Sequence, residues 1–192
     1  MRKYFIMALV CILSLTTFAT SMSAKTNEES NTKGTIDQNS SIEEVELVME
    51  KYTYTEGGTV FFDVEKAKND GQSEFIIESG LALNSISQEY KDYINGPEKT
   101  TGRFLLAKMS IPVYGNWCGP GHGSGSPIDY LDNACRQHDY GYQKYGYYDC
   151  DTDAKLIFQI NQDYKKMGVK EKIYANAVKA YFSAQMKVRG CK

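Results

Sequence analysis

One stretch, residues 114–139 (YGNWCGPGHGSGSPIDYLDNACRQHD), constrains the fold more than any other part of the chain. Its first half is crowded with glycines, at Gly115, Gly119, Gly121, Gly123 and Gly125. Because glycine has no Cβ, such a loop can turn sharply and direct its backbone carbonyls inward. Pro127 suits the first turn of a helix, where its missing N–H costs little. The stretch therefore predicts a glycine-rich loop that leads directly into a helix.

The helix after Pro127 is expected to be amphipathic, because apolar side chains recur at helical spacing. This inward stripe consists of Leu131, Ala134, Cys135, His138 and Tyr142. Asp139 points about 100° away from His138, since an α-helix has about 3.6 residues per turn. Ca²⁺ takes roughly six to eight oxygen ligands from carboxylates and backbone carbonyls. The loop and the His-Asp pair together indicate a hard-cation site beside a general base, although either half alone is usually an ordinary loop or helix.

Together the two halves resemble the secreted phospholipases A2. The calcium loop of that family reads Y-G-x-x-C-G-x-G, matched here by Tyr114, Gly115, Cys118, Gly119 and Gly121. Its catalytic helix reads D-x-x-C-x-x-H-D-x-x-Y, matched by Asp132, Cys135, His138, Asp139 and Tyr142. The resemblance covers roughly residues 103–192 and leaves the first half of the chain unassigned.

Two cysteines of the vertebrate pattern are missing from the catalytic helix. Ala134 stands where the first of two adjacent cysteines is expected, and Gly141 stands where another follows the His by three residues. These departures remove two disulfides but no ligand. They indicate an atypical subgroup, bacterial-like or bee-venom-like, with few disulfides.

The resemblance implies calcium-dependent hydrolysis of the sn-2 ester of glycerophospholipids to a fatty acid and a lysophospholipid. The implied calcium ligands are the backbone carbonyls of Trp117, Gly119 and Gly121 together with the Asp139 carboxylate. His138 would take a proton from the attacking water, and the N–H of Gly119 would stabilise the oxyanion. The alternative is a non-catalytic phospholipase A2-like calcium- and membrane-binding protein or toxin.

A third group must orient His138, because a neutral imidazole acts as a base while its other nitrogen donates to a fixed acceptor. Asp153 shares a predicted helical face with Leu156, Ile157 and Ile160, whereas Asp151 points elsewhere and suits helix capping. The bee-venom type, which reads C-D-x-D-x-K, favours Asp153, and the vertebrate C-D pair favours Asp151. Tyr142 would donate a hydrogen bond to Asp153.

Residues 1–24 have the pattern of a secretory signal peptide, with Arg2 and Lys3 before an apolar run and small residues up to Ala24. The run is too short to span a bilayer. We therefore expect a secreted, extracellular protein. Removal of the signal takes Cys11 away and leaves four cysteines, an even number that favours two disulfides.

The resemblance implies the bond Cys118–Cys135, so that Cys150–Cys191 is the remaining pair. A zinc site is not expected, since the chain has only two histidines and their spacing to the cysteines fits no zinc pattern.

Charge divides the chain into two unlike halves. Residues 25–102 hold 16 acidic and 7 basic residues, a net charge of −9, while residues 103–192 hold 13 basic and 8 acidic residues, a net charge of +5. The basic half favours an anionic phospholipid membrane surface as partner, with an ordinary solvated surface as the alternative. Nucleic acid is not expected, because no basic patch alternates with stacking aromatics. We expect a monomer.

The expected fold is mainly α: a phospholipase A2-like domain at 103–192 with a calcium loop, two disulfides and further helices at 151–166 and 171–189. In the last of these, Lys172, Lys179, Lys187 and Arg189 are expected on the solvent side. The apolar residues Phe104, Leu105, Leu106, Met109 and Ile111 either line an acyl channel or belong to the core.

The acidic segment at 25–102 is expected to be α+β-like or partly disordered. Residues 42–54 suit a helix, residues 59–64 (TVFFDV) and 74–77 (EFII) suit strands, and Gly57-Gly58 suits a turn. The segment is either a pro-segment that covers the membrane-binding face until cleavage between residues 95 and 103, or an independent accessory module.

Overall fold

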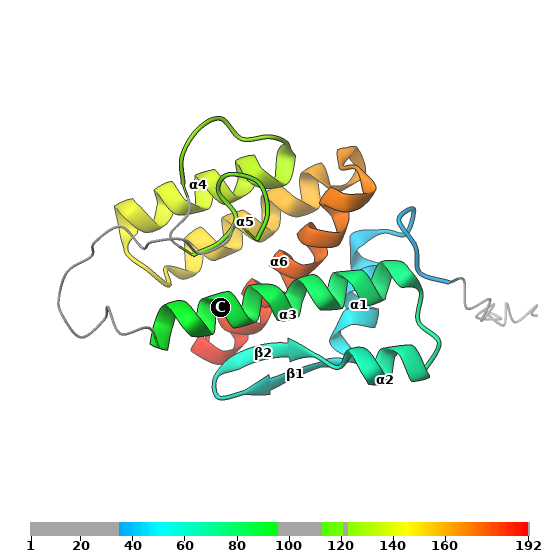
Figure 1. Ribbon diagram of the computed structural model, residues 1–192. Helices are drawn as coiled ribbons and strands as arrows, with labels where there is room; N and C mark the ends of the chain where they lie inside the picture. Colours follow the sequence, from blue (N-terminus) through cyan, green and yellow to red (C-terminus); the bar gives the residue numbers. More distant parts are fainter. Residues whose placement is uncertain (1–34, 96–112, 121–122, 192) are drawn as a thin grey trace, which may run out of the picture. The chain divides into compact units, whose positions relative to one another are not determined.

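The computed structural model describes residues 35–95, 113–120 and 123–191, which all lie in one structural unit (Figure 1). In chain order the elements are α1 (Ile42–Glu50), β1 (Thr53–Glu56), β2 (Thr59–Phe62), α2 (Val64–Asn69), α3 (Glu74–Asn95), α4 (Tyr130–Tyr145), α5 (Cys150–Asp163), the 3₁₀ turn η2 (Tyr164–Lys166) and α6 (Val169–Arg189). The predicted signal peptide and the apolar residues at 104–111 lie outside the described residues. None of the helices in the three ranges has both the length and the hydropathy that crossing a membrane requires.

The helices share one hydrophobic core. α4 packs against α5, α3 packs against α6 and β2, and α6 also contacts α5 and α1 (Figure 1). The core includes Leu83 of α3, Leu131 of α4, Ile160 of α5 and Ala177 of α6, none of which is exposed to solvent. Residues before and after position 102 therefore bury their apolar side chains together. Whether residues 25–102 are removed stays a prediction.

Most elements agree with the sequence pattern. The mainly helical class and the two disulfides are confirmed, and the helices expected at 151–166 and 171–189 correspond to α5 with η2 and to α6. β2 lies within the strand expected at 59–64. The helix expected at 42–54 is shorter, since α1 ends at Glu50 and β1 begins at Thr53.

The strand expected at 74–77 is wrong, because these residues form the first turn of α3. Phe75, Ile76 and Ile77 are all buried, since α3 is packed against more than one neighbour. A short continuous apolar run can belong to a strand or to a buried helix, and periodicity alone does not distinguish them. Tertiary packing on several sides of α3 accounts for the run.

The β-hairpin is fastened to α3 through Asn84 and Phe62. β1 and β2 are antiparallel, and Gly57 and Gly58 both adopt positive φ in the two-residue turn between them. The Asn84 amide accepts a hydrogen bond from the N–H of Phe62 at 2.7 Å and donates one to its carbonyl at 2.9 Å. The Phe62 ring packs over Gly80 of α3, where a Cβ would lie 2.1 Å from a ring carbon.

We expect Gly80→Ala to destabilise the protein by roughly 1–3 kcal/mol, because the added methyl group overpacks this contact. Alanine is the better helix former by about 1 kcal/mol, so any loss reports the clash and not helix propensity. Urea unfolding gives the free energy. Leu81→Ala is the matched control, since Leu81 is the next residue of α3 and is 51% exposed. A variant more stable than the native protein by about 1 kcal/mol, the gain in helix propensity alone, would show that the hairpin does not pack tightly on Gly80.

Candidate functional site

The glycine-rich loop is anchored by the buried side chain of Asp132. Its Oδ1 accepts hydrogen bonds from the N–H groups of Asn116 and Trp117 at 2.9 and 2.8 Å, and its Oδ2 accepts one from Ile128 at 2.9 Å. Asp132 is fully buried, so these three charge-assisted bonds replace its lost hydration. Gly115 approaches this carboxylate so closely, at a φ of 58°, that a Cβ would lie 2.4 Å from it. The loop therefore needs glycine at this position.

We expect Asp132→Asn to destabilise the protein by roughly 1–3 kcal/mol. An amide can present only one acceptor oxygen, so at least one loop N–H would be left buried without a partner. Differential scanning calorimetry measures the loss. Asp163→Asn is the control, because its carboxylate pairs with Lys166, whose side chain is 59% exposed. Equal stability of the two variants would contradict the anchoring role of Asp132.

Two disulfides fasten the elements that carry the site. Cys118–Cys135 joins the loop to α4, and Cys150–Cys191 joins the start of α5 to the residue that follows Gly190 at the end of α6. This is the pairing that the family resemblance implies.

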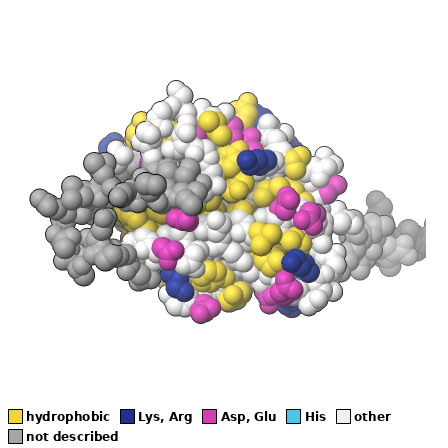
Figure 2. Space-filling view, viewed as in Figure 1, with side chains coloured by type: hydrophobic (Ala, Val, Ile, Leu, Met, Phe, Trp, Pro, Cys, Tyr) yellow, Lys and Arg dark blue, Asp and Glu magenta, His cyan; other side chains and the backbone are white. Residues whose placement is uncertain are grey.

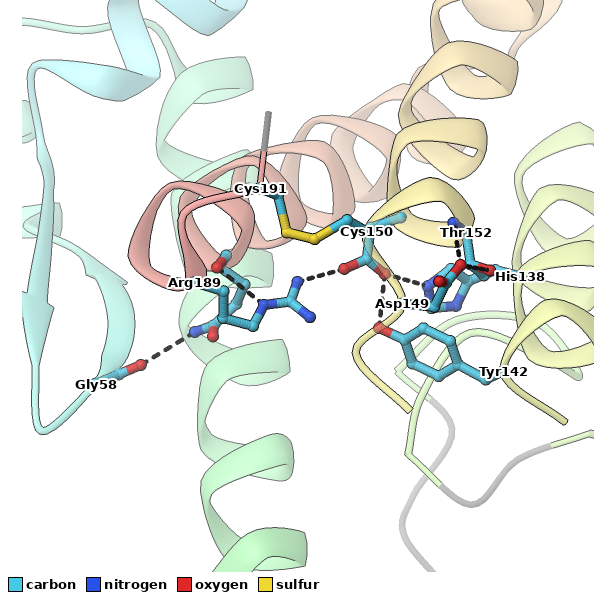
Figure 3. Close-up of polar contacts among 10 residues, drawn as sticks. Gly58, His138, Tyr142, Asp149, Cys150, Thr152, Arg189 and Cys191 are labelled. Atoms are coloured by element: carbon cyan, nitrogen blue, oxygen red, sulfur yellow. Dashed lines mark hydrogen bonds and ion pairs between the residues drawn. A yellow bond between two sulfur atoms is a disulfide. The ribbon is translucent and has the colours of Figure 1, made fainter. Parts of the chain in front are cut away.

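His138 of α4 lies against Asp153 of α5. Its Nε2 is 2.8 Å from Asp153 Oδ1, and the hydroxyl of Tyr142 donates to the same oxygen at 2.6 Å. Figure 3 shows His138 and Tyr142 converging on this carboxylate. His138 and Asp153 are both buried, whereas Asp151 is exposed at the start of α5. Of the two aspartates considered from the sequence, the structure brings Asp153 to His138.

The environment keeps Asp153 ionised. Burial raises the pKa of its carboxyl, but hydrogen bonds from His138, Tyr142 and Arg189 outweigh burial and hold the pKa below its usual value. Burial, and then the hydrogen bond to Asp153, raises the pKa of Tyr142, so the phenol stays a donor. Because an ionised carboxylate can only accept a hydrogen bond, this contact requires the Nε2–H form of the His138 ring.

Asp139 has the properties of a carboxylate that needs a cation. Its Oδ2 is buried and has no hydrogen-bond partner in the part of the chain that the structure describes. Burial, and then the charge of Asp132, raises the pKa of Asp139 to about 8. A buried carboxylate oxygen without a donor is costly, and a bound cation would satisfy it.

A pocket brings the predicted site residues together. It is lined by Trp117, Gly119, His138 and Asp139, and on another side by Ile86 and Tyr90 of α3. Gly121 lies outside the described residues. Within the described ranges there is no group of three or more His, Cys, Asp or Glu side chains that could hold a metal. A metal here would need backbone carbonyls beside Asp139, which is the ligand set expected for calcium.

Sequence reasoning missed three residues of the site. The sequence pattern gave no role to Ile86 and Tyr90, and Tyr90 is fixed by stacking on Tyr181 with 4.7 Å between ring centroids.

The expectation that Arg189 is on the solvent side is wrong, because its guanidinium contacts Asp153. Lys179 was also expected in solvent but is buried against Glu46 at 2.8 Å. α6 packs against α1, α3 and α5 and so has no continuous solvent side.

Comparison with known proteins bears on part of the chain. A stretch of 45 residues, 23% of the chain, is 58% identical to the acidic phospholipase A2 homolog taipoxin gamma chain of Oxyuranus scutellatus scutellatus. The match supports a phospholipase A2-like relationship. The chain spans 27% of the length of this phospholipase A2 homolog, and the match does not identify a subgroup. No family model matches the chain, and no solved structure matches it.

Proposed function

We propose that this chain is a secreted, calcium-dependent phospholipase A2 that hydrolyses the sn-2 ester of glycerophospholipids to a fatty acid and a lysophospholipid. The observation that carries the proposal is the buried His138–Asp153 pair next to Oδ2 of Asp139, which has no hydrogen-bond partner among the described residues. A base and a carboxylate suited to a cation line the same pocket. The phospholipase A2-like match and the motif residues supply the reaction class.

His138 acts as the general base in the proposed reaction. Asp153 accepts a hydrogen bond from Nε2–H, which fixes the ring so that Nδ1 can take a proton from water. The water then attacks the ester carbonyl, and the Asp153 carboxylate stabilises the imidazolium that forms. The Tyr142 hydroxyl holds Asp153 in place at 2.6 Å. The protonated imidazole then returns its proton to the leaving alcohol oxygen.

Calcium fits the donor set of the pocket. Asp139 would hold it through Oδ2, which no described residue hydrogen-bonds, together with the carbonyls of Trp117, Gly119 and Gly121. When bound, calcium would act as a Lewis acid that polarises the ester carbonyl and neutralises the developing oxyanion. The N–H of Gly119 would donate to the same oxyanion.

The proposed partner is an anionic phospholipid surface. Residues 103–192 carry a net charge of +5, and basic residues near such a surface contribute about 1 kcal/mol each. On the face drawn in Figure 2, acidic and basic side chains are interspersed with apolar ones. Binding to an anionic membrane would therefore depend on the net positive charge of residues 103–192 and not on a purely basic patch on this face.

Fatty-acid release from mixed phosphatidylcholine–phosphatidylglycerol vesicles, measured with calcium and with a chelator, tests the function. From lipid labelled in the sn-2 acyl chain, we expect labelled fatty acid to be released in calcium and not in chelator. One fatty acid should form for each lysophospholipid. Calcium-dependent vesicle binding without any release would instead establish the non-catalytic alternative. Release that is equal in chelator would contradict the calcium requirement.

A further inference from the structure

The site contains a charged contact, between Arg189 and Asp153, that has no role in the proposed reaction as described above. His138 and Tyr142 both bond to Oδ1 of Asp153, while Nη2 of Arg189 contacts Oδ2 of the same carboxylate. Arg189 is the last residue of α6, so α4 and α6 approach the two oxygens of one α5 side chain. The Asp153 side chain is fully buried and that of Arg189 is 21% exposed.

The Arg189 side chain is held on several sides. Its Nε donates to the carbonyl of Gln185 at 3.0 Å, and its guanidinium carbon lies 5.3 Å from the centre of the Tyr148 ring. The Gln185 amide in turn donates to the carbonyl of Gly58 in the hairpin turn at 3.1 Å. Figure 3 shows this line of contacts from Gly58 to His138.

The backbone next to Arg189 is fixed as well. Gly190 ends α6 in the left-handed conformation, and Cys191 then forms its disulfide with Cys150, three residues before Asp153. The guanidinium is therefore presented to Asp153 by a preorganised arrangement and not by a free surface side chain.

Arg189 supplies the positive charge that a buried carboxylate requires. Among the described residues, the other titratable groups that interact electrostatically with Asp153 are His138 and Tyr142 from α4, Tyr90 from α3 and Tyr181 from α6, together with Asp149 before α5. Burial raises the pKa of both Tyr90 and Tyr181, so these two phenols are neutral. Among the described residues that contact Asp153, Arg189 is the permanent cation.

We propose that Arg189 is a positioning residue for the base: by holding Oδ2, it orients the Asp153 carboxylate so that Oδ1 faces His138 and Tyr142. Arginine suits this task because its guanidinium remains charged and presents donors in a rigid plane. The proposal rests on the proposed function, in which His138 is the base. The contacts of Arg189 also link the hairpin turn and the end of α6 to the His138–Asp153 pair.

The kinetic test replaces Arg189 by Gln and by Lys. We expect Arg189→Gln to lower kcat about 10- to 100-fold, as is typical for residues that orient a ligand or base, with unchanged KM and calcium affinity. Arg189→Lys should recover part of the loss. Lys187→Gln is the matched control, because it removes the same charge from the same helix, where Lys187 pairs with Glu50 at the surface. A native kcat in Arg189→Gln, or an equal loss in Lys187→Gln, overturns the proposal.

A double-mutant cycle separates positioning from general support of the fold. If Arg189 acts through Asp153, the loss in Arg189→Gln combined with Asp153→Asn should be no larger than the loss in Asp153→Asn alone. Losses that multiply would show that Arg189 acts by another route and overturn the proposal.

A readout independent of hydrolysis distinguishes this proposal from the proposed function. The imidazole ¹⁵N spectrum shows which ring nitrogen carries the proton, and the chain has only one other histidine, His122, to serve as reference. We expect the Nε2–H tautomer of His138 in the native protein and a mixture of tautomers in Arg189→Gln, with His122 unchanged. Unchanged His138 signals overturn the proposal. If the native protein releases no fatty acid but Arg189→Gln still shows a mixture of His138 tautomers, the proposed function is rejected and the positioning role of Arg189 stands.

Discussion

Replacing His138 by Gln is expected to abolish fatty-acid release and to leave calcium binding intact. In the proposed reaction this imidazole alone activates the water, so the rate should fall by at least about 10⁴-fold. Glutamine has a similar length and can still donate to Asp153, so the buried contact at 2.8 Å need not collapse. Vesicle hydrolysis measures the rate, and titration calorimetry measures calcium affinity.

Gln137→Ala is the control for the His138 variant, because Gln137 is the preceding residue of α4 and is exposed. It should keep native activity. Turnover by His138→Gln above the level of contamination would mean that another group activates the water. Loss of calcium binding in the same variant would mean that the imidazole is needed at the cation site.

Replacing Asp139 by Asn should remove calcium binding and turnover together. This carboxylate is the single full negative charge assigned to the cation site, and the buried Oδ2 would lose its charge with little change of shape. We expect calcium affinity to fall at least about 100-fold. Calcium at 100 times its Kd stabilises a folded protein by about 2.7 kcal/mol, so the rise in Tm on adding calcium should also disappear.

Asp151→Asn is the matched control, since it makes the same chemical change at an exposed aspartate of α5. It should alter neither calcium binding nor turnover, and it tests the other candidate partner of His138. Native calcium affinity in Asp139→Asn would reject Asp139 as a ligand. Lost turnover with native calcium affinity would place Asp139 in catalysis by some other means.

The local parts of this site could be predicted from the sequence because their chemistry is encoded at short range. Helical spacing places His138 and Tyr142 on the inner face of α4, and the same rule places Asp153 inward on α5 while Asp151 stays exposed. The contact between His138 and Asp153 needs only two helices that pack side by side.

The rest of the site depends on contacts between distant residues, which periodicity does not encode. Ile86 and Tyr90 reach the pocket because α3 packs on α6, and the apolar start of α3 has the same pattern as a buried strand. Arg189 has the position of an ordinary solvated side chain in the helical pattern of α6. Only the packing of α6 against α5 reveals that its guanidinium faces Asp153.

The packing of α3 on α6 also has a kinetic consequence. Where the two helices meet, the buried amide of Asn176 donates to the hydroxyl of Ser79 at 3.1 Å across 97 positions of the chain. Each helix can form within about a microsecond. Contacts between residues so far apart in the sequence form more slowly, because a long loop must first close. During synthesis α3 leaves the ribosome well before α6, so the face of α3 that packs on α6 stays uncovered until the last helix is made. Apolar surface left uncovered during that interval is prone to aggregate.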